Sequence, residues 1–408
     1  MIRINLLIAI TIVLVACSGK KEQTATMVLA PLASPADSLT AEPHVFTDNT
    51  GAVFLSWVEK QKDTSRFWYS RLTNAQWSSP ALIAKGTSWF VNWADYPMMT
   101  TDGQGKFIAH LLEKSGKGTY AYDVMVYAST DSGLSWNPPF KLNEDGKQAE
   151  HGFVTLVAYA DKVFVTWLDG RNTAMEGMQG MENMDHSGHQ GAMSLRAAVM
   201  DYSGNKSGEW ELDNKTCDCC QTTAAITDNG PIVIYRDRSD EEIRDMSIVR
   251  FVDGTWTTPK AIHSDNWKIA GCPVNGPRVA VLGNQVVVAW FSAATEPAHV
   301  NVVFSDDGGA TFGEAVSIDE GKALGRVDVE WLDNRRAIVS WMEGTLIKAI
   351  VVHANGDKEL PVTIAESSEA RSSGFPQMTK SGNQLIFAWT DDKQKQVKVA
   401  SVTLGENN

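Results

Sequence analysis

Two short stretches of the chain concentrate the side chains that bind soft metal ions. The polar, glycine-rich run 175–193 supplies thioethers and imidazoles from Met175, Met178, Met181, Met184, His186, His189 and Met193. Farther along, a group of thiols comes from Cys217, Cys219, Cys220 and Cys272. Sulfur ligands select Cu(I) or Zn(II), and imidazole adds affinity for Cu(II). These residue types predict copper binding, with zinc as the second choice of metal.

The spacing of the methionines argues against a buried helix. Four of them recur at every third residue, and Gly177 and Gly180 stand between them. A helical stripe would alternate steps of three and four residues and would avoid glycine. The segment MDHSGHQGAM (184–193) also resembles the Met/His-rich segments of periplasmic copper-resistance proteins. The alternative is a low-complexity loop that binds no ligand.

The cysteines have a second explanation, because four thiols in an oxidising compartment can form disulfides. Either two bridges, or one bridge that leaves two thiols for a metal, would fit. Cys219 and Cys220 are adjacent and could bridge each other only with strain. Metal and disulfide therefore stay open as alternatives, and His151 and His44 are candidate auxiliary metal ligands.

The N-terminus predicts export and anchoring. One arginine and a short apolar run indicate a signal peptide over residues 1–16. Its end, LVAC (14–17), resembles the bacterial lipobox, which implies a lipid on Cys17 and a place in the cell envelope, facing the periplasm or the cell surface. An ordinary secretory signal is the alternative. We expect residues 17–40 to form a flexible tether and residues 41–408 to fold.

Charge and length narrow the function classes. The net charge of −13, without a basic cluster, argues against nucleic acid or an anionic membrane surface as a partner. The predicted lipid on Cys17 would then be the contact with the membrane. A folded part of about 365 residues exceeds the usual single core, which favours two domains or a repeat architecture.

A repeat is visible as an apolar run that ends in a small residue and an aromatic ring. VFLSW (53–57), VFVTW (163–167) and LIFAW (385–389) are three copies. The aromatic position is filled seven times, with one histidine among the rings, by Trp57, His110, Trp167, Tyr235, Trp290, Trp341 and Trp389. Each copy has the composition of a buried strand, and the flanks supply three more strands per repeat. The pattern predicts an all-β, seven-bladed β-propeller with four-stranded antiparallel blades, six blades being the fallback. The last blade lacks a fourth strand, which residues 24–30 could supply.

Two turns carry a family motif. STDSGLSW (129–136) and SDDGGATF (305–312) match the Asp-box, Ser/Thr-x-Asp-x-Gly-x-x-Trp/Phe, and DGTW (253–256) looks like a worn copy. The chain thereby resembles the sialidase-like (Asp-box, or BNR repeat) β-propeller superfamily. The resemblance implies a propeller fold and no catalysis, because Asp-boxes are structural and lie on the face opposite the sialidase active site.

The resemblance stops at the catalytic residues. Sialidases share an arginine triad for the substrate carboxylate, a Tyr–Glu nucleophile pair and an Asp acid/base. Their Arg-Ile-Pro token is absent here, where EPHVF (42–46) stands in its place. Arg171, Arg236 and Arg238 are candidate carboxylate clamps, but ion pairs with nearby acids such as Asp169 explain them equally well. We therefore lean against an enzyme and keep an exo-sialidase-like glycosidase as the alternative.

Propeller geometry brings the soft ligands together. Loops that lead into the innermost strands share a face with loops that join second and third strands. Cys217, Cys219 and Cys220 precede the first strand of blade four, and Cys272 precedes the first strand of blade five. The insertion 171–193 falls between two strands of blade three. The leading prediction is a monomeric, lipid-anchored propeller that handles copper together with copper-trafficking proteins. A non-catalytic glycan- or protein-binding propeller, using Trp89, Trp93 and Tyr96, is a further alternative.

Overall fold

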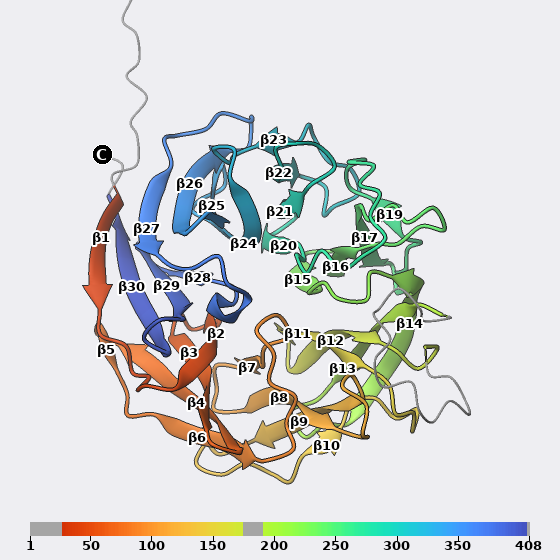
Figure 1. The fold of residues 1–408 in the computed structure, drawn as a ribbon, viewed down its shortest axis with the longest axis vertical. Coiled ribbons are helices and arrows are strands. Elements are labelled where there is room, and N and C mark those ends of the chain that lie inside the picture. The colour runs from red at the N-terminus through yellow and green to blue at the C-terminus, as the bar shows by residue number, and fades with distance from the viewer. Residues whose placement is uncertain (1–26, 174–190, 406–408) are drawn as a thin grey trace, which may run out of the picture.

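The computed structural model describes residues 27–173 and 191–405, and these form a ring of seven antiparallel β-sheets around a central channel (Figure 1). The prediction of a seven-bladed all-β propeller is confirmed. Within these two ranges the elements are strands, apart from one short 3-10 helix, η2 (Arg371–Ser373). Each blade begins at the channel and runs outward, strand by strand.

The first three blades are built from residues 40–216. Blade one contains β2 (Thr40–Thr47), β3 (Val53–Gln61), β4 (Thr64–Thr73), β5 (Gln76–Trp77) and β6 (Ala81–Gly86). Blade two contains β7 (Met99–Thr101), β8 (Phe107–Lys114), β9 (Tyr122–Ser129) and β10 (Phe140–Lys141). Blade three contains β11 (His151–Tyr159), β12 (Lys162–Asp169), β13 (Met193–Met200) and β14 (Lys206–Thr216).

The next three blades follow in the same order. Blade four contains β15 (Thr223–Thr227), β16 (Gly230–Arg236), β17 (Met246–Val252), β18 (Thr255–Trp256) and β19 (Lys260–Ala261). Blade five contains β20 (Arg278–Leu282), β21 (Gln285–Ser292), β22 (His299–Ser305) and β23 (Val316–Ser317). Blade six contains β24 (Ala323–Trp331), β25 (Arg336–Glu343), β26 (Leu346–His353) and β27 (Val362–Glu366). In blades one and four the outermost strand is split into two short pieces that pair with the same neighbour.

The seventh blade joins the two ends of the described chain. It contains β28 (Gln377–Ser381), β29 (Gln384–Asp391), β30 (Gln396–Leu404) and, as its outer strand, β1 (Met27–Leu32). β1 pairs antiparallel with β30, from Met27 opposite Leu404 to Leu32 opposite Val399. Residues 27–40, assigned from sequence to a flexible tether with 24–30 as a closing strand, thus belong to the propeller. Ala36 in this part is 2% exposed.

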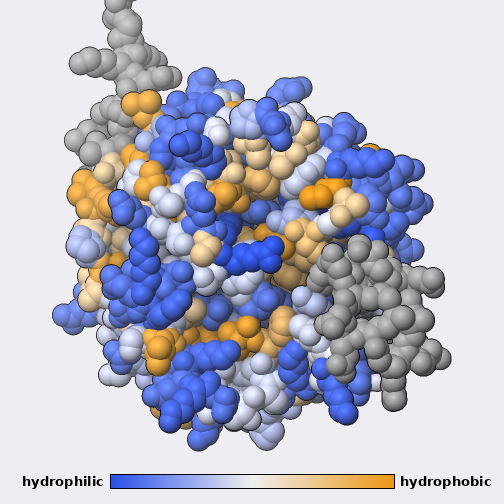
Figure 2. Space-filling view, viewed as in Figure 1, coloured by the Kyte–Doolittle hydropathy of each residue, from blue (hydrophilic) through white to orange (hydrophobic). Residues whose placement is uncertain are grey.

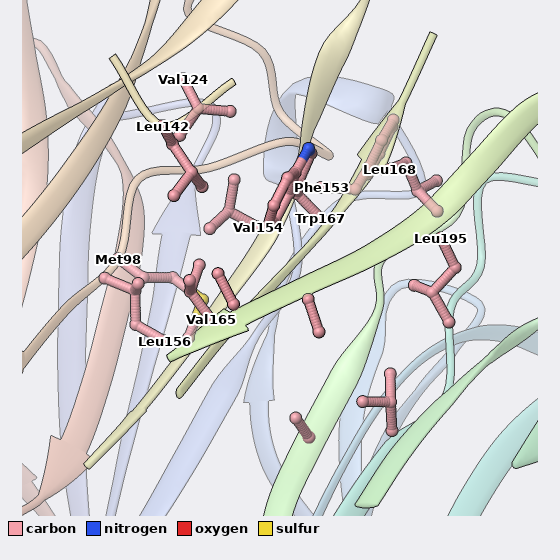
Figure 3. Packing of buried hydrophobic residues seen from close by; sticks show 14 of the residues in the cluster. Met98, Val124, Leu142, Phe153, Val154, Leu156, Val165, Trp167, Leu168 and Leu195 are labelled. Carbon is pink, nitrogen blue, oxygen red and sulfur yellow. The ribbon is translucent and has the colours of Figure 1, made fainter. Parts of the chain in front are cut away.

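The repeated ring positions of the sequence all lie in the second strand of a blade. Trp57, Trp167 and Trp341 are at most 2% exposed, as is His110. Figure 3 shows how blades two and three meet, with Val124, Val154 and Trp167 pointing into a shared apolar layer. Removing a buried ring of this size costs about 3–5 kcal/mol, so the repeat reflects packing between blades.

Both Asp-boxes form tight turns after the third strand of a blade. In blade two, Ser135 donates its N–H to the Asp131 carboxylate across 3.0 Å and its hydroxyl across 2.6 Å. These hydrogen bonds lower the pKa of Asp131 to about 2. Gly133 holds φ +79°, a value that favours glycine. The turns are structural, as the resemblance implied.

The face seen in Figure 2 has hydrophilic residues over the centre of the ring and apolar residues at the rim, on the side where Figure 1 places β1. Val28 and Leu29 of β1 are 57% and 46% exposed. Within residues 27–173 and 191–405, no helix has the length and apolar character needed to cross a membrane.

Candidate functional site

Three thiols meet in the loop between β14 and β15. The Sγ of Cys217 lies 3.6 Å from that of Cys220 and 4.0 Å from that of Cys219. All three sulfurs lie within 4.8 Å of one another, and the three residues are buried. The fourth cysteine, Cys272, lies in the loop before β20 and contacts Cys219. We call these four residues the thiol cluster.

The loop that carries the thiol cluster is held from both sides. Asp218 accepts the backbone N–H of Met193 across 3.2 Å and pairs with Arg238 across 3.0 Å. The backbone N–H of Cys217 donates to the carbonyl of Arg236 across 3.0 Å. Blades three and four therefore fix the backbone on which the sulfurs stand, which favours a preorganised site.

A buried guanidinium faces the thiol cluster. Arg244 is 4% exposed and donates from Nη1 to the Sγ of Cys217 across 3.1 Å. Its other donors bind the Glu242 carboxylate at 2.6 Å and 3.2 Å. A positive charge at this distance favours the thiolate form of a cysteine.

The four thiols differ in their proton affinity. Hydrogen bonds with Cys219 and Cys220, joined by the charge of Arg244, hold the pKa of Cys217 well below its usual range. Burial raises the pKa of Cys220 to about 12, and the hydrogen bond to Cys217 raises the pKa of Cys219. A hydrogen bond from Cys219 lowers the pKa of Cys272. The thiol cluster thus combines thiolate acceptors with thiol donors.

No disulfide joins the four cysteines of the described ranges, which are all free thiols. A disulfide needs about 2.05 Å between sulfurs, whereas the separations here are 3.6 Å and 4.0 Å. Sulfurs bound to one ion with bonds of about 2.3 Å lie about 3.5–4 Å apart. The arrangement suits thiolate coordination of a soft ion. Its structural alternative is apolar packing, because the buried thiols also belong to the core of blades three and four.

Of the candidate ligands in the Met/His-rich stretch, only Met193 lies among the described residues. Met175, Met178, Met181, Met184, His186 and His189 lie outside the described residues, as does the expected lipidation residue Cys17. Met193, where β13 begins, is 2% exposed and packs in the same core cluster as the buried cysteines. Its hydrogen bond to Asp218 shows that the chain leaving the insertion passes next to the thiol cluster.

The two candidate auxiliary histidines make their hydrogen bonds with residues outside the thiol cluster. His151 is fully buried and contacts Asp145 at 2.7 Å and Asp169 at 3.6 Å. These three residues could hold a metal ion, but Arg171 already pairs with Asp169 at 2.7 Å and with Asp145 at 3.4 Å. A resident cation among the carboxylates disfavours a metal there.

His44 lies in the central channel. It lines a cavity of about 460 Å³ together with one inner strand from every blade. Its Nδ1 accepts the backbone N–H of Met99 across 3.4 Å. Burial, aided by Arg278 and His110, lowers the pKa of His44 to about 3. A neutral imidazole buried in this way is a packing residue of the channel wall.

The three candidate carboxylate clamps are engaged by the protein. Arg171 pairs with Asp169, as the ion-pair interpretation expected. Arg238 pairs with Asp218 at 3.0 Å and with Glu242 at 2.9 Å. Arg236 is 1% exposed and donates to carbonyls, including Arg244 O at 2.7 Å. Arg236 also donates to the carbonyls of Asn275 and Phe291, across 2.9 Å and 2.7 Å, so the three arginines are held by separate sets of partners.

A second group of polar side chains, Asp95, Tyr122 and Glu150, stands at the channel mouth, and the sequence patterns did not predict it. The Tyr122 hydroxyl donates to Glu150 across 2.7 Å, and the Phe153 N–H donates to Asp95 across 2.7 Å. Burial raises the pKa of Asp95 to about 7 and that of Glu150 to about 8. Asp95 and Glu150 stand in NWADY (92–96) and EHG (150–152), the stretches that lead into two inner strands. That position is the one sequence feature that could have indicated a shared site.

Three other arginines surround an aromatic set at this mouth. Arg326 and Arg371 lie over the ring of Trp93 at 5.2 Å and 6.0 Å, and Arg278 lies over Tyr96 at 5.7 Å. Most donors of Arg326 are taken by the protein, for example by the Ser373 hydroxyl at 2.7 Å. Trp93 and Tyr96 are used in packing here. Trp89 pairs with Glu113 through an isolated backbone bridge.

Comparisons with known proteins give several similar solved structures and one matching family. No curated protein matches the sequence. Similar solved structures include a protein of unknown function from Dyadobacter fermentans, with 12% identity, coverage of 93% of this chain and 98% of that chain, and a TM-score of 0.48. A Hadza microbial sialidase shows 13% identity, 74% and 63% coverage and a TM-score of 0.43. A neuraminidase-like protein from a bat source in Guatemala shows 10% identity, 94% and 95% coverage and a TM-score of 0.49.

The family comparison is more specific, because the model of the BNR repeat-like domain matches residues 52–386. This match covers most of the chain and spans the Asp-box turns of blades two and five. The chain therefore belongs to the BNR repeat-like domain family.

Proposed function

We propose that this BNR repeat-like propeller binds a soft metal ion, Cu(I) before Zn(II), at the thiol cluster. The single observation that carries the proposal is the meeting of three buried sulfurs within 4.8 Å of one another, on a backbone held by neighbouring blades. Thiolate sulfur is the ligand type that selects these ions. The lowered pKa of Cys217 supplies one thiolate before any metal arrives.

Cu(I) is favoured over Zn(II) by the number and burial of the ligands. Structural Zn(II) takes four ligands, whereas Cu(I) is stable with two or three sulfurs. The three buried thiols supply such a set, and Cys272 would have to complete a zinc site from a partly exposed loop. The nearby charge of Arg244 would offset part of the negative charge of several thiolates on a monovalent ion.

The proposed setting of this metal site is the bacterial cell envelope. A lipid-anchored protein of the bacterial cell envelope with a Met/His-rich insertion beside the thiol cluster would suit copper acquisition, delivery or detoxification. The thioethers would collect the ion with low selectivity, and the thiol cluster would hold it more tightly. The hydrogen bond from the Met193 N–H to Asp218 supports this setting, because it holds the last methionine of the stretch next to the thiol cluster.

A competition titration tests this function. Reduced full-length protein is titrated with Cu(I) in the presence of a chromogenic Cu(I) chelator, next to Cys217→Ser, Cys219→Ser and Cys220→Ser variants and a variant lacking residues 175–193. We expect one tight site that each serine variant weakens by about 100-fold or more, while the deletion lowers only the weak stoichiometry. A protein that leaves all Cu(I) with the chelator would exclude the function.

A glycosidase is the second candidate, favoured by the channel-mouth carboxyls. Asp95 and Glu150 have pKa values of about 7 and 8, a range suited to a general acid. Arg371, the exposed member of the three arginines, could contact an acidic glycan. Fluorogenic sialoside turnover that is lost in Asp95→Asn would support it, and the absence of turnover over a wide pH range would eliminate it.

A further inference from the structure

Cys272 differs from the other members of the thiol cluster in its access to solvent. Cys217, Cys219 and Cys220 are 1%, 8% and 2% exposed, whereas Cys272 is half-buried. It stands in the loop between β19 and β20 and contacts Cys219, so it occupies the solvent side of the cluster. Among the four described cysteines it is the one that a metal donor in solution can reach first.

The loop that carries Cys272 is fixed at both ends and open between them. On one side the Ile269 N–H donates to the Glu242 carbonyl across 3.0 Å. On the other, the Gly276 N–H donates to the Gln221 side chain across 3.0 Å. Between these anchors Gly271 is exposed, and a Cβ added there would meet only one atom, at 3.8 Å. Cys272 therefore stands on an open loop segment between two fixed anchors.

Metal transfer between proteins proceeds by ligand exchange, in which a new sulfur bond forms before an old one breaks. A fully buried three-sulfur site cannot meet a donor's sulfur directly, so transfer needs a ligand that reaches both. Access sets the rate of such steps at a cysteine, and Cys272 is the half-buried member of a cluster whose other thiols are buried.

We infer that Cys272 is the exchange ligand through which Cu(I) enters and leaves the buried thiols, its partner being a Cu(I) carrier with thiol or thioether ligands. This inference rests on the proposed metal binding. In each step one Cu–S bond to Cys272 forms as one bond to the carrier breaks. Copper stays Cu(I), and any proton on the Cys272 thiol passes to water. The ion then bonds to Cys219 and the sulfurs behind it, whose protons are likewise released.

The test separates equilibrium affinity from exchange rate. Full-length wild type, Cys272→Ser and Cys220→Ser are loaded with Cu(I), and extraction by a chromogenic Cu(I) chelator is followed by stopped flow and at equilibrium. For Cys272→Ser we expect extraction and loading to slow by about tenfold or more, with affinity unchanged within about threefold. For Cys220→Ser we expect weaker affinity and faster extraction. Gly271→Ala, which changes the same loop without removing a ligand, should behave as wild type.

The outcomes distinguish the two proposals. If wild type takes no Cu(I) from the chelator, the proposed function fails. If wild type binds and Cys272→Ser exchanges at the same rate, the role of Cys272 is refuted while metal binding stands. A loss of affinity of about 100-fold in Cys272→Ser would make Cys272 a permanent fourth ligand and would also overturn the exchange role. Circular dichroism of each variant confirms that the propeller is intact.

Discussion

The Nη1 of Arg244 lies 3.1 Å from the Sγ of Cys217, and this contact joins a buried positive charge to a buried thiol. Arg244 comes from the segment between β16 and β17 of blade four, and Cys217 from the loop that joins β14 of blade three to β15 of blade four. Hydrogen bonds to an ionised group stabilise it by about 1.5–3 kcal/mol. The charge state of the thiol cluster therefore depends on a residue that is not itself a metal ligand.

Replacing Arg244 should raise the pKa of Cys217. In Arg244→Met the thiolate loses its charged donor, and we expect a rise of about one to two pKa units, since each unit corresponds to about 1.4 kcal/mol. Thiolate absorbance followed against pH measures it, with the Cys217→Ser titration subtracted from each curve. Arg244→Lys keeps the charge and should shift the pKa less. An unchanged titration in Arg244→Met would show that the neighbouring thiols alone hold the proton off Cys217.

Metal binding should release protons and strengthen as pH rises. The raised pKa values of Cys219 and Cys220 keep both thiols protonated near neutral pH, and coordination requires both thiolates. We expect about two protons released per Cu(I), and an affinity that rises about 100-fold per pH unit below the pKa of these thiols. Calorimetry in buffers of different ionisation enthalpy counts the protons. Binding independent of pH would point to thioether ligands in place of the thiol cluster.

Glu150 should make the folded state less stable as pH rises. Burial raises its pKa from 4.5 to about 8, so between these values the unfolded chain has lost a proton that the folded chain retains. The free energy of unfolding then falls with increasing pH across this window, by about 1–3 kcal/mol for a partly exposed group. Thermal unfolding of Glu150→Gln from pH 5 to pH 9 should show a flatter dependence, because glutamine does not titrate, while its amide oxygen can still accept from Tyr122. Glu366→Gln, at an exposed position of β27, is the control and should keep the wild-type slope.

The closing strand β1 should be required for stability. It pairs six residues with β30, and Leu32 packs against the core shared by blades one and seven. A protein that begins at residue 33 would expose the edge of β30, and we expect its melting temperature to fall by about 10 °C or more relative to one that begins at residue 27. Val28→Ala, at a position that is 57% exposed, should have little effect. Equal melting temperatures for the two lengths would mean that β1 is dispensable.

Much of the fold could be predicted because short sequence patterns recur once in every blade. The ring positions at Trp57, Trp167 and Trp341 mark second strands, since burial between blades demands the same residue type at the same place in each repeat. The Asp-box turns were equally local: the side chain of Asp131 and the glycine at 133 act within a few residues of each other. The sequence offers residues 24–30 as a closing strand because the last repeat lacks its fourth strand, and residues 27–32 do pair with β30, more than 360 residues away. Composition alone does not reveal where such a long-range pairing begins and ends.

The sequence by itself determined the blade count, the strand order and the fact that cysteines open two neighbouring blades. Only the tertiary structure decided which groups share a site. In the folded ring Arg244 contacts Cys217, His44 lines the central channel, and His151 contacts Asp145. Arg171, Arg236 and Arg238 each bind different partners within the protein. The reason is physical. Strand periodicity depends on near neighbours, whereas charges and ligands take whichever partners the closed ring brings within a few ångströms.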